Sequence, residues 1–313
     1  MDQVAAVVVT YNRKELFAEC LTAILNQTRH VDDIVVIDNA STDGTPDVIK
    51  AQGYLTHPRF HYLRMKKNLG GAGGFYKGIQ YAHQLSTDWL WIMDDDTIPD
   101  ADCLENLLKA KEELQHERIS YLASAIYGLN NECMNVPTLD TRAEVNGYSG
   151  WYRHLSAGIM NIRSATFVSI LINNDAVSQC GLPCKDYFIW GDDGEYTLRL
   201  TTYYGKAYFI GSSVAIHKRA IAKSLDISNE TDPKRIRMFW YYFRNNGIND
   251  RFYQLKSHTV LRQLFNCIGS IKYLKEENGF WKMLASVKGS FFALIQYSKF
   301  ESYIKDQLGK MNC

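Results

Sequence analysis

Short apolar runs alternate with helix-patterned segments through the first half of the chain. Residues Val4–Thr10 (VAAVVVT) are apolar at almost every position, which is typical of a strand covered on both faces of a parallel sheet. The segment 15–27 instead places Leu16, Cys20 and Leu21 at helical spacing. The alternation continues with strands at 34–38, 60–63 and 89–93 and with helices at 46–52 and 73–84. This order predicts an α/β fold with a mostly parallel sheet and flanking helices.

The pattern changes near Thr231 and Asp232. Before this point we expect a helix at 100–115, strands at 121–127, 206–210 and 213–217, a polar loop at 130–150 and a helix at 195–204. After it the pattern is helical, with apolar stretches at 239–243, 260–273 and 280–300. The sequence therefore predicts a first domain of residues 1–231 and a helical C-terminal region of residues 232–313.

Composition narrows the class of protein. The chain has 313 residues, of which 46% are hydrophobic and 22% charged, which is ordinary globular usage and enough to bury a full core. Met1 and Asp2 lead directly into the first strand, and no stretch approaches about 18 apolar residues. We therefore expect neither a secretory signal nor a transmembrane helix. The seven cysteines show no zinc-site or disulfide pattern, so we expect reduced thiols and a cytoplasmic location.

The net charge of the chain is +1, but its basic and acidic residues are unevenly distributed along the sequence. A balance this close to neutral carries no nucleic-acid signature, so we expect no nucleic-acid partner. Residues 232–313, however, hold 14 Lys and Arg against 6 Asp and Glu. Such a basic region either binds an acidic surface or forms a solvated helical face, and the charge pattern leaves both interpretations open.

Polar or glycine-rich turns follow four consecutive predicted strands. They are TYNR ending at Arg13, DNASTD starting at Asp38, NLGGAGG starting at Asn68 and DDD starting at Asp94. In open parallel sheets, ligands bind beyond the carboxyl ends of the strands, so we expect a ligand site at this edge. The glycines of residues 68–74 would let the backbone approach a ligand, although they do not match the dinucleotide fingerprint and a purely structural turn would also explain them.

The run Asp94-Asp95-Asp96 predicts a divalent metal site. Three adjacent carboxylates repel one another, and a cation would offset that repulsion. In an extended segment alternate side chains point the same way, so Asp94 and Asp96 can share one ion. Oxygen ligands of this kind suit Mg²⁺ or Mn²⁺. A solvated acidic turn or a helix cap is the alternative explanation.

A second acidic group follows an aromatic run. Asp192 or Asp193, beside Trp190, is a candidate general base, and helix capping by these carboxylates is the structural alternative. His217, at a predicted strand end, becomes a candidate ligand if the metal site needs a nitrogen. The residue types alone leave open which of Asp192 and Asp193 is the base.

Taken in order, these pieces resemble the family-2 glycosyltransferases, whose GT-A fold is Rossmann-like. The matching segments are VVVTYNR, IDNASTDGT, the DDD run and WGDDGEYTLRL with the later His217, so the resemblance covers roughly residues 4–220. The segment NLGGAGGF is most similar to the galactofuranosyltransferases and neighbouring rhamnosyltransferases.

The resemblance implies an inverting, metal-dependent transfer of a sugar from a nucleotide donor. The donor would be UDP-galactofuranose, with dTDP-rhamnose as the alternative, and the acceptor a saccharide or lipid-linked glycan of a surface polysaccharide such as O-antigen or capsule. By the same resemblance Asp193 would be catalytic, and Asp94, Asp96 and His217 would hold Mn²⁺ or Mg²⁺. The donor nucleotide would contact Thr10, Arg13, Asp38, Asn68, Asp94 and Asp95, and the sugar or acceptor would contact Trp151, Trp190 and Asp192.

Two other classes of protein fit parts of the sequence. A sugar-1-phosphate nucleotidyltransferase also uses a nucleotide-binding α/β sheet and Mg²⁺, but the TYNR turn lacks the glycine-rich, basic loop usual after the first strand of those enzymes. A non-catalytic carbohydrate-binding protein would not need a metal triplet together with a separate base.

The C-terminal helices mix apolar and basic residues. Leu264 and Phe265 share a helical segment with Lys272, Lys275 and Lys282. Basic, aromatic-rich amphipathic helices can lie on an anionic membrane surface. Alternatively, the apolar faces pack on the first domain or on a second copy of the chain. We therefore expect either peripheral contact with the inner face of the cell membrane or packing, including homo-oligomerisation.

Overall fold

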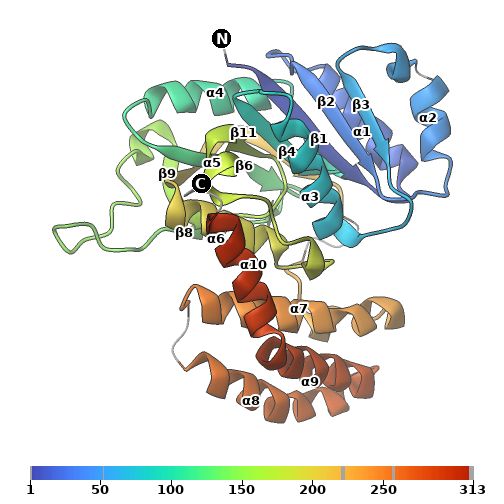
Figure 1. The fold of residues 1–313 in the computed structure, drawn as a ribbon, viewed down its shortest axis with the longest axis vertical. Coiled ribbons are helices and arrows are strands. Elements are labelled where there is room, and N and C mark those ends of the chain that lie inside the picture. The colour runs from blue at the N-terminus through green and yellow to red at the C-terminus, as the bar shows by residue number, and fades with distance from the viewer. Residues whose placement is uncertain (1, 52, 220–222, 256–257, 310–313) are drawn as a thin grey trace.

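A single mixed sheet forms the centre of the chain's first 217 residues (Figure 1). The computed structural model describes residues 2–51, 53–219, 223–255 and 258–309. The order of strands is β3-β2-β1-β4-β10-β6-β11-β9-β8, with β5 pairing to β11 and β7 to β6. The strands are β1 (Val4–Thr10), β2 (Asp33–Asp38), β3 (Phe60–Arg64), β4 (Trp89–Asp94), β5 (Thr97–Pro99), β6 (Ile119–Tyr127), β7 (Cys133–Met134), β8 (Thr138–Leu139), β9 (Ile159–Ser164), β10 (Ile170–Asn173) and β11 (Lys206–His217).

Helices cover both faces of this sheet. Strand β1 is buried on both sides, with Val4, Ala6 and Val8 in one apolar core and the alternate residues in the other. The first core is closed by α1 (Lys14–Leu25), α2 (Thr45–Ala51) and α4 (Cys103–Glu113), and the second by α3 (Gly70–His83), α5 (Asn174–Cys180) and α6 (Asp192–Tyr203). The predicted α/β architecture with a mostly parallel sheet is therefore confirmed.

Several local predictions were incomplete. Strand β10 runs antiparallel between β4 and β6, and neither it nor β9 or α5 was expected from the sequence. The two short strands predicted at 206–210 and 213–217 are one strand, β11, whose pairing with β6 shifts register between Ile210 and Val214. The 130–150 loop contains the short strands β7 and β8. Short 3₁₀ helices lie at η1 (Tyr54–Thr56), η2 (Leu155–Ala157), η3 (Lys185–Tyr187) and η4 (Ile227–Asn229).

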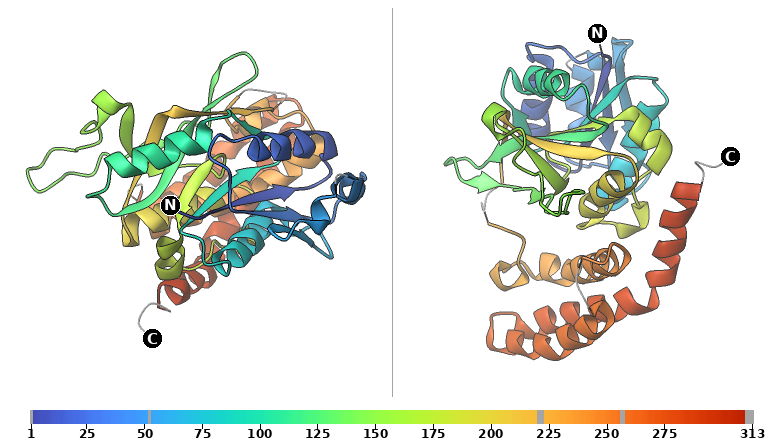
Figure 2. Two further views of the ribbon diagram at one scale, coloured as in Figure 1. Left: turned by 90° about the horizontal axis from the view of Figure 1, so that it is seen from above. Right: turned by 90° about the vertical axis from the view of Figure 1, so that its left-hand side faces the viewer.

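The C-terminal region is a separate helical layer that rejoins the body. Figures 1 and 2 show α7, α8 and α9 stacked beneath the sheet and α10 rising back along the body. Helix α10 is tied there by Tyr303, which donates to the carbonyl of Pro183 at 2.9 Å, and by Gln307, which accepts from the amide of Leu182 at 2.9 Å. The elements are α7 (Pro233–Phe252), α8 (Thr259–Gly269), η5 (Ser270–Lys275), α9 (Gly279–Ile295) and α10 (Tyr297–Gly309).

Helix α9 packs on α7 through its small residues. Ala285, Ser286, Gly289 and Ala293 are buried, whereas Phe291 on the same helix is exposed. A Cβ atom on Gly289 would lie 2.5 Å from the carbonyl oxygen of Trp240 in α7, so the two backbones approach as closely as a glycine permits.

Two expectations from composition concern the described residues. Within that part of the chain, no helix is both long and apolar enough to cross a membrane. Six of the seven cysteines, from Cys20 to Cys267, are free thiols in the structure, and Cys313 lies outside the described residues.

Candidate functional site

Four strands end at one edge of the sheet and carry the polar side chains predicted from the sequence. Thr10, Asp38 and Asp94 are the last residues of β1, β2 and β4, which run parallel. Strand β10 is antiparallel to both β4 and β6, and β11 is parallel to β6, so β11 also ends at this edge with His217. The topology therefore gathers residues from all parts of the first 217 positions.

Asp94, Asp96 and His217 form a cluster with the geometry of a metal site. One ligand atom from each lies within 4.8 Å of the other two. Nε2 of His217 is 3.0 Å from Oδ1 of Asp96, and Nδ1 is 2.8 Å from Oδ1 of Asn135. The Asn135 contact orients the imidazole so that Nε2 points into the cluster. Two carboxylates and one imidazole are a donor set that a divalent cation such as Mn²⁺ accepts.

The electrostatics of the triplet favour a cation. Burial, followed by the charges of Asp96 and Asp95, raises the pKa of Asp94 well above its usual range. Burial also raises the pKa of Asp95, to about 6. For Asp96 burial acts in the same direction but is outweighed by His217 and Arg13, which lower its pKa. A positive ion between these groups would favour the ionised carboxylates against both the burial and the mutual repulsion that raise these pKa values.

Arg13 supplies part of that positive charge from the turn after β1. Its Nη1 atom lies 2.6 Å from Asp96 and 3.3 Å from Asp95. The backbone amide of Tyr11 also donates to Asp95, at 3.3 Å. The turn after β1 therefore contacts both Asp95 and Asp96, and Asp96 also contacts His217.

Asp38 and Asn68 organise the turns in which they lie. Asp38 is fully buried and accepts from the amide of Ser41 at 2.7 Å and from the hydroxyl of Tyr62 at 2.5 Å. Asn68 accepts from the amide of Gly70 at 2.7 Å, which shapes the start of α3. Asn39, which we did not single out from the sequence, joins the two turns by accepting from Leu69 and donating to Gly70, both at 2.9 Å.

The glycine run is mainly a packing device. Helix α3 begins at Gly70, three residues earlier than predicted, so most of these glycines are helical. A Cβ on Gly74 would lie 2.4 Å from Val9, and one on Gly78 2.4 Å from Val7, so the glycines let α3 lie close against β1. Gly70 has φ of +73° and touches the carbonyl of Phe188, which links the run to the next acidic group.

Asp192 and Asp193 occupy the first turn of α6, which begins three residues before the predicted helix. Burial and the neighbouring Asp193 raise the pKa of Asp192 to about 8. Burial likewise raises the pKa of Asp193, although backbone amides of the turn oppose it. The charge of Asp192 contributes to the raised pKa of Asp94, so the α6 carboxylates and the metal cluster share one electrostatic environment.

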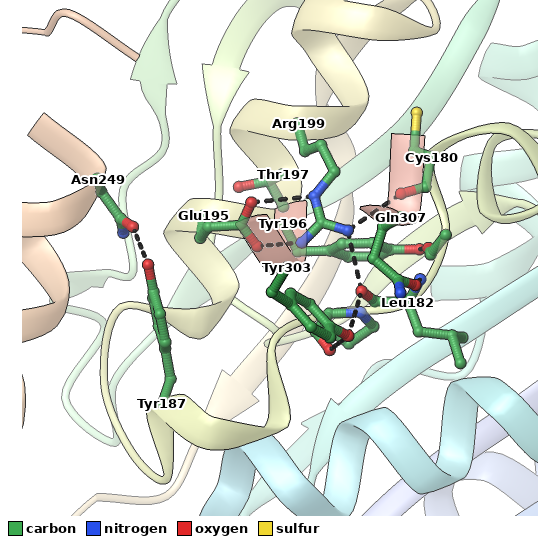
Figure 3. Close-up of polar contacts among 12 residues, drawn as sticks. Cys180, Leu182, Tyr187, Glu195, Tyr196, Thr197, Arg199, Asn249, Tyr303 and Gln307 are labelled. Carbon is green, nitrogen blue, oxygen red and sulfur yellow. Dashed lines mark hydrogen bonds and ion pairs between the residues drawn. The ribbon is translucent and has the colours of Figure 1, made fainter. Parts of the chain in front are cut away.

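A buried ion pair supports this helix one turn further on (Figure 3). Glu195 and Arg199 are both fully buried and are joined by contacts of 3.0 and 2.5 Å. Arg199 also donates to the carbonyls of Cys180 and Leu182, at 3.0 and 2.9 Å, and the hydroxyl of Tyr253, the residue that follows α7, donates to Glu195 at 2.7 Å. Glu195, which follows the two aspartates in the same helical turn, therefore connects α6 to the rest of the protein.

The two candidate tryptophans lie in different places. Trp190, directly before the acidic turn, stacks obliquely on Phe239 of α7 at 4.7 Å, and the guanidinium of Arg235 lies 5.6 Å from its ring. Trp151 belongs to the 140–158 segment, where its ring meets Tyr152 edge to face. Among the described residues, no ring contact or hydrogen bond joins Trp151 to the carboxylates.

A cavity of about 390 Å³ opens beside the cluster and has a basic wall. Arg13 and Asp96 line it on the side of the sheet. The rest of the lining includes the basic Lys218, Arg219, Lys223 and Arg235 and the acidic Asp226 and Glu230, of which Glu230 pairs with Arg235 at 2.8 Å. The sequence analysis missed this wall, although the basic run that follows His217 was a visible signal for it. Such a surface suits a ligand with several negative charges.

Comparison with known proteins identifies the class. Residues 5–151 match the model for "Glycosyl transferase family 2". The structure resembles S. aureus TarS 1–349 in complex with UDP, with a TM-score of 0.57 and 13% identity over 99% of this chain and 89% of that one. It also resembles GalNAc-T7 with UDP, GalNAc and Mn²⁺, with a TM-score of 0.57 and 13% identity over 79% of this chain and 52% of that one. The fold is thus that of the GT-A glycosyltransferases.

Curated relatives agree with this class. The galactofuranosyltransferase GlfT1 of Mycolicibacterium smegmatis is 31% identical over 64% of this chain and 65% of its own length. The Mycobacterium tuberculosis GlfT1 is 36% identical over 38% of this chain, and the abequosyltransferase RfbV of Salmonella typhimurium is 37% identical over 28%. The chain spans less than two thirds of the length of these relatives: the M. tuberculosis match covers 39% and the RfbV match 26%. Residues 5–151 thus match a family-2 glycosyltransferase domain, and the relatives named here are themselves glycosyltransferases.

Proposed function

We propose that this chain is an inverting, metal-dependent glycosyltransferase that transfers galactofuranose from UDP-galactofuranose to a saccharide or lipid-linked glycan. The observation that carries the proposal is the cluster of Asp94, Asp96 and His217 beside the cavity with a basic wall. The galactofuranosyltransferase relatives support the choice of sugar. Transfer from dTDP-rhamnose is the alternative donor chemistry.

Each group then has a defined task. A divalent cation held by Asp94, Asp96 and His217 would stabilise negative charge on the departing diphosphate. Arg13 and Lys218 in the cavity lining face the same charge, because a phosphate-rich leaving group needs several cations. Asp193 removes the proton from the acceptor hydroxyl, which attacks the anomeric carbon from the face opposite the leaving group. Thr10, Asp38 and Asn68 shape the nucleotide edge of the site.

A donor panel tests this assignment. UDP release is measured with UDP-galactofuranose, UDP-galactopyranose, UDP-glucose and dTDP-rhamnose (for the last, dTDP release), each with Mn²⁺ and with EDTA. We expect the fastest release from UDP-galactofuranose and none in EDTA. Asp96→Ala should abolish release and the Mn²⁺-dependent part of UDP binding, whereas the exposed Asp100→Ala should behave as wild type.

The outcomes separate the classes of protein. Full activity in EDTA contradicts the metal assignment. Pyrophosphate release from UTP and a sugar phosphate would identify a nucleotidyltransferase. Binding without any release from these donors or an added acceptor would indicate a carbohydrate-binding protein.

We also propose that α8, η5 and α9 contact an anionic lipid surface, on the inner face of the cell membrane. Leu264, Phe265, Ile268 and Ile271 are 48–67% exposed and lie in a helical segment with a continuous apolar side. Arg262, Lys272 and Lys275 of the same segment and Lys288 of α9 are also exposed. Lys282, which the sequence analysis counted with these, is buried and contacts Glu276 at 3.1 Å, so it does not add to the basic surface.

Flotation with liposomes tests this contact. The protein should float with phosphatidylglycerol-containing vesicles at low salt and less at high salt, because charge contributes to the binding. Phe265→Glu should prevent flotation, and Leu129→Glu, at an equally exposed position of the body, should not. If the wild-type protein stays at the bottom at low salt, the lipid contact is refuted. Self-association that Phe265→Glu abolishes would then assign the face to a second copy of the chain.

A further inference from the structure

The segment 187–191, which leads into the acidic turn, has an unfavourable backbone conformation. Phe188 and Trp190 have φ of +66° and +61°, and Gly191 has φ of +89°. Left-handed backbone is a genuine outlier for a bulky aromatic residue, and such conformations persist only where the surroundings impose them. Asp192 and Asp193 follow directly, so the contacts that impose this conformation also fix the positions of these two residues at the start of α6.

Side chains of α7 hold the segment from the C-terminal side. The amide nitrogen of Asn245 lies 3.1, 3.0 and 2.6 Å from the carbonyl oxygens of Tyr187, Ile189 and Trp190. Asn249 donates to the carbonyl of Gly191 at 2.9 Å and accepts from the hydroxyl of Tyr187 at 2.7 Å (Figure 3). Four of the five carbonyls of the segment are therefore bound by two side chains of one helix.

The opposite side of the segment is held by α3. The amide of Ala72 donates to the carbonyl of Phe188 at 3.1 Å, and this carbonyl would lie 1.9 Å from a Cβ on Gly70. Helix α3 thus binds the carbonyl of Phe188, and α7 binds the other four carbonyls of the segment 187–191. The strained turn is clamped between a helix of the first domain and a helix of the C-terminal region.

The two asparagines contribute little to α7 itself. Asn245 is fully buried in the interior of the 20-residue α7, and Asn249, 4% exposed, lies in its last turn. Asparagine is a poor residue for a helix interior, because its side chain competes with the backbone hydrogen bonds. Residue types that are unfavourable for the helix or strand in which they lie are expected at positions where function requires them. Here both side-chain amides are directed at the segment 187–191.

We propose that Asn245 and Asn249 are positioning residues for the acidic turn of α6. They keep the segment 187–191 in its strained conformation and thereby fix the carboxylates of Asp192 and Asp193 relative to the metal cluster and the bound sugar. This inference rests on the proposed function, in which Asp193 accepts the acceptor proton. It makes the C-terminal region a part of the transfer site, although no residue of that region belongs to the proposed metal or base groups.

Isosteric variants test the proposal in the full-length protein. Asn249→Asp and Asn245→Asp replace the donating amide with a carboxylate of the same shape. The matched control is Asn246→Asp on the same helix, because among the described residues Asn246 donates to the carbonyl of Tyr242 within α7, at 2.9 Å, and not to the segment 187–191. We measure kcat and KM with UDP-galactofuranose, UDP affinity in Mn²⁺, melting temperature, and amide hydrogen exchange of peptides covering residues 186–200.

We expect Asn249→Asp to lower kcat at least 10-fold with UDP affinity within 2-fold of wild type, and to raise exchange in residues 186–195. The control should change none of these. Because the asparagine acts through the base, adding Asn249→Asp to Asp193→Asn should lower kcat no further. If both asparagine variants keep wild-type kcat and exchange, or lose kcat and UDP affinity together in proportion to lost folded protein, the proposal is overturned.

The exchange measurement keeps this test separate from that of the proposed function. If the wild-type protein transfers no sugar from any donor, the proposed function fails, but exchange still reports whether α7 holds the turn. Raised exchange at residues 186–195 with an unchanged melting temperature supports the holding contact in that case. Unchanged exchange in both asparagine variants overturns it.

Discussion

Breaking the buried pair of Glu195 and Arg199 should destabilise the protein strongly. Arg199→Met removes two contacts to Glu195 and two to the carbonyls of Cys180 and Leu182, and all but the Leu182 contact are fully buried. Leaving one partner of a buried pair uncompensated costs about 3–5 kcal/mol. Unfolding entropy near 2.1 cal/mol/K per residue gives a chain of this size roughly 0.65 kcal/mol/K, so the melting temperature should fall by about 5–8 °C.

The measurement is thermal unfolding of Arg199→Met, Glu195→Leu and the double variant, without nucleotide and at fixed pH. Each single variant should show the fall, and the double variant should lose clearly less than the sum, because it leaves no unpaired buried charge. Lys109→Met removes the lysine of an exposed pair with the same i,i+4 spacing, Glu105–Lys109, and should leave the melting temperature nearly unchanged.

Two outcomes would refute this reasoning. If neither single variant differs from Lys109→Met, the buried pair does not stabilise the fold. If the double variant loses the full sum, the two side chains are not coupled, and the cost arises from the freed carbonyls of Cys180 and Leu182.

Three further predictions concern the acidic turn. Asp193→Asn should lower kcat by roughly 10²–10⁴ with UDP binding retained, and a larger loss in Asp192→Asn would assign the base to Asp192 instead. Because the pKa of Asp192 is raised to about 8, its ionisation opposes folding increasingly as pH rises from about 4 to 8. In EDTA, Asp192→Asn should therefore raise the melting temperature more at pH 8 than at pH 5.5. An equal rise at both pH values would contradict this prediction. Gly70→Ala should lower kcat and the melting temperature, since its Cβ would meet the Phe188 carbonyl at 1.9 Å, whereas Gly71→Ala, which meets nothing within 4 Å, should have little effect on either.

The sequence predicted the parts of the fold that depend on local pattern. Strands β1, β2 and β4 are buried on both faces, so their apolar runs were visible, and the polar residues that end them mark the ligand edge. Strand β9 was missed because only Ile159 and Ile162 of its six residues are buried, so it has no continuous apolar run, and β10 because it is only four residues long. The antiparallel insertion of β10 between β4 and β6 depends on pairing across the sheet, which no local pattern encodes.

The candidate metal site could be predicted from the sequence, but the residues that orient its side chains could not. Asp94, Asp96 and His217 were expected together from residue type and the family resemblance, and the structure brings their ligand atoms within 4.8 Å. Asn135, which orients His217, lies in a polar loop that offers no distinguishing signal. Asn245 and Asn249 could not be predicted for a different reason. Their partners are backbone carbonyls almost 60 residues earlier, and because every residue has a backbone carbonyl, the sequence does not indicate which ones are bound.

The two faces of α9 differ in the side chains that they can accommodate. Its inner face admits only small side chains, because Gly289 touches the backbone of α7 and Ala293 lies 2.8 Å from where a Cβ on Gly247 would be. Its outer face carries large apolar side chains, such as Phe280 and Phe291, that contribute little to this packing. The outer face can therefore change over evolution, and adapt to a different surface, while the inner face is confined to a few residue types. A larger side chain on the inner face would displace α7, and the displacement would be transmitted to the carboxylates that begin α6.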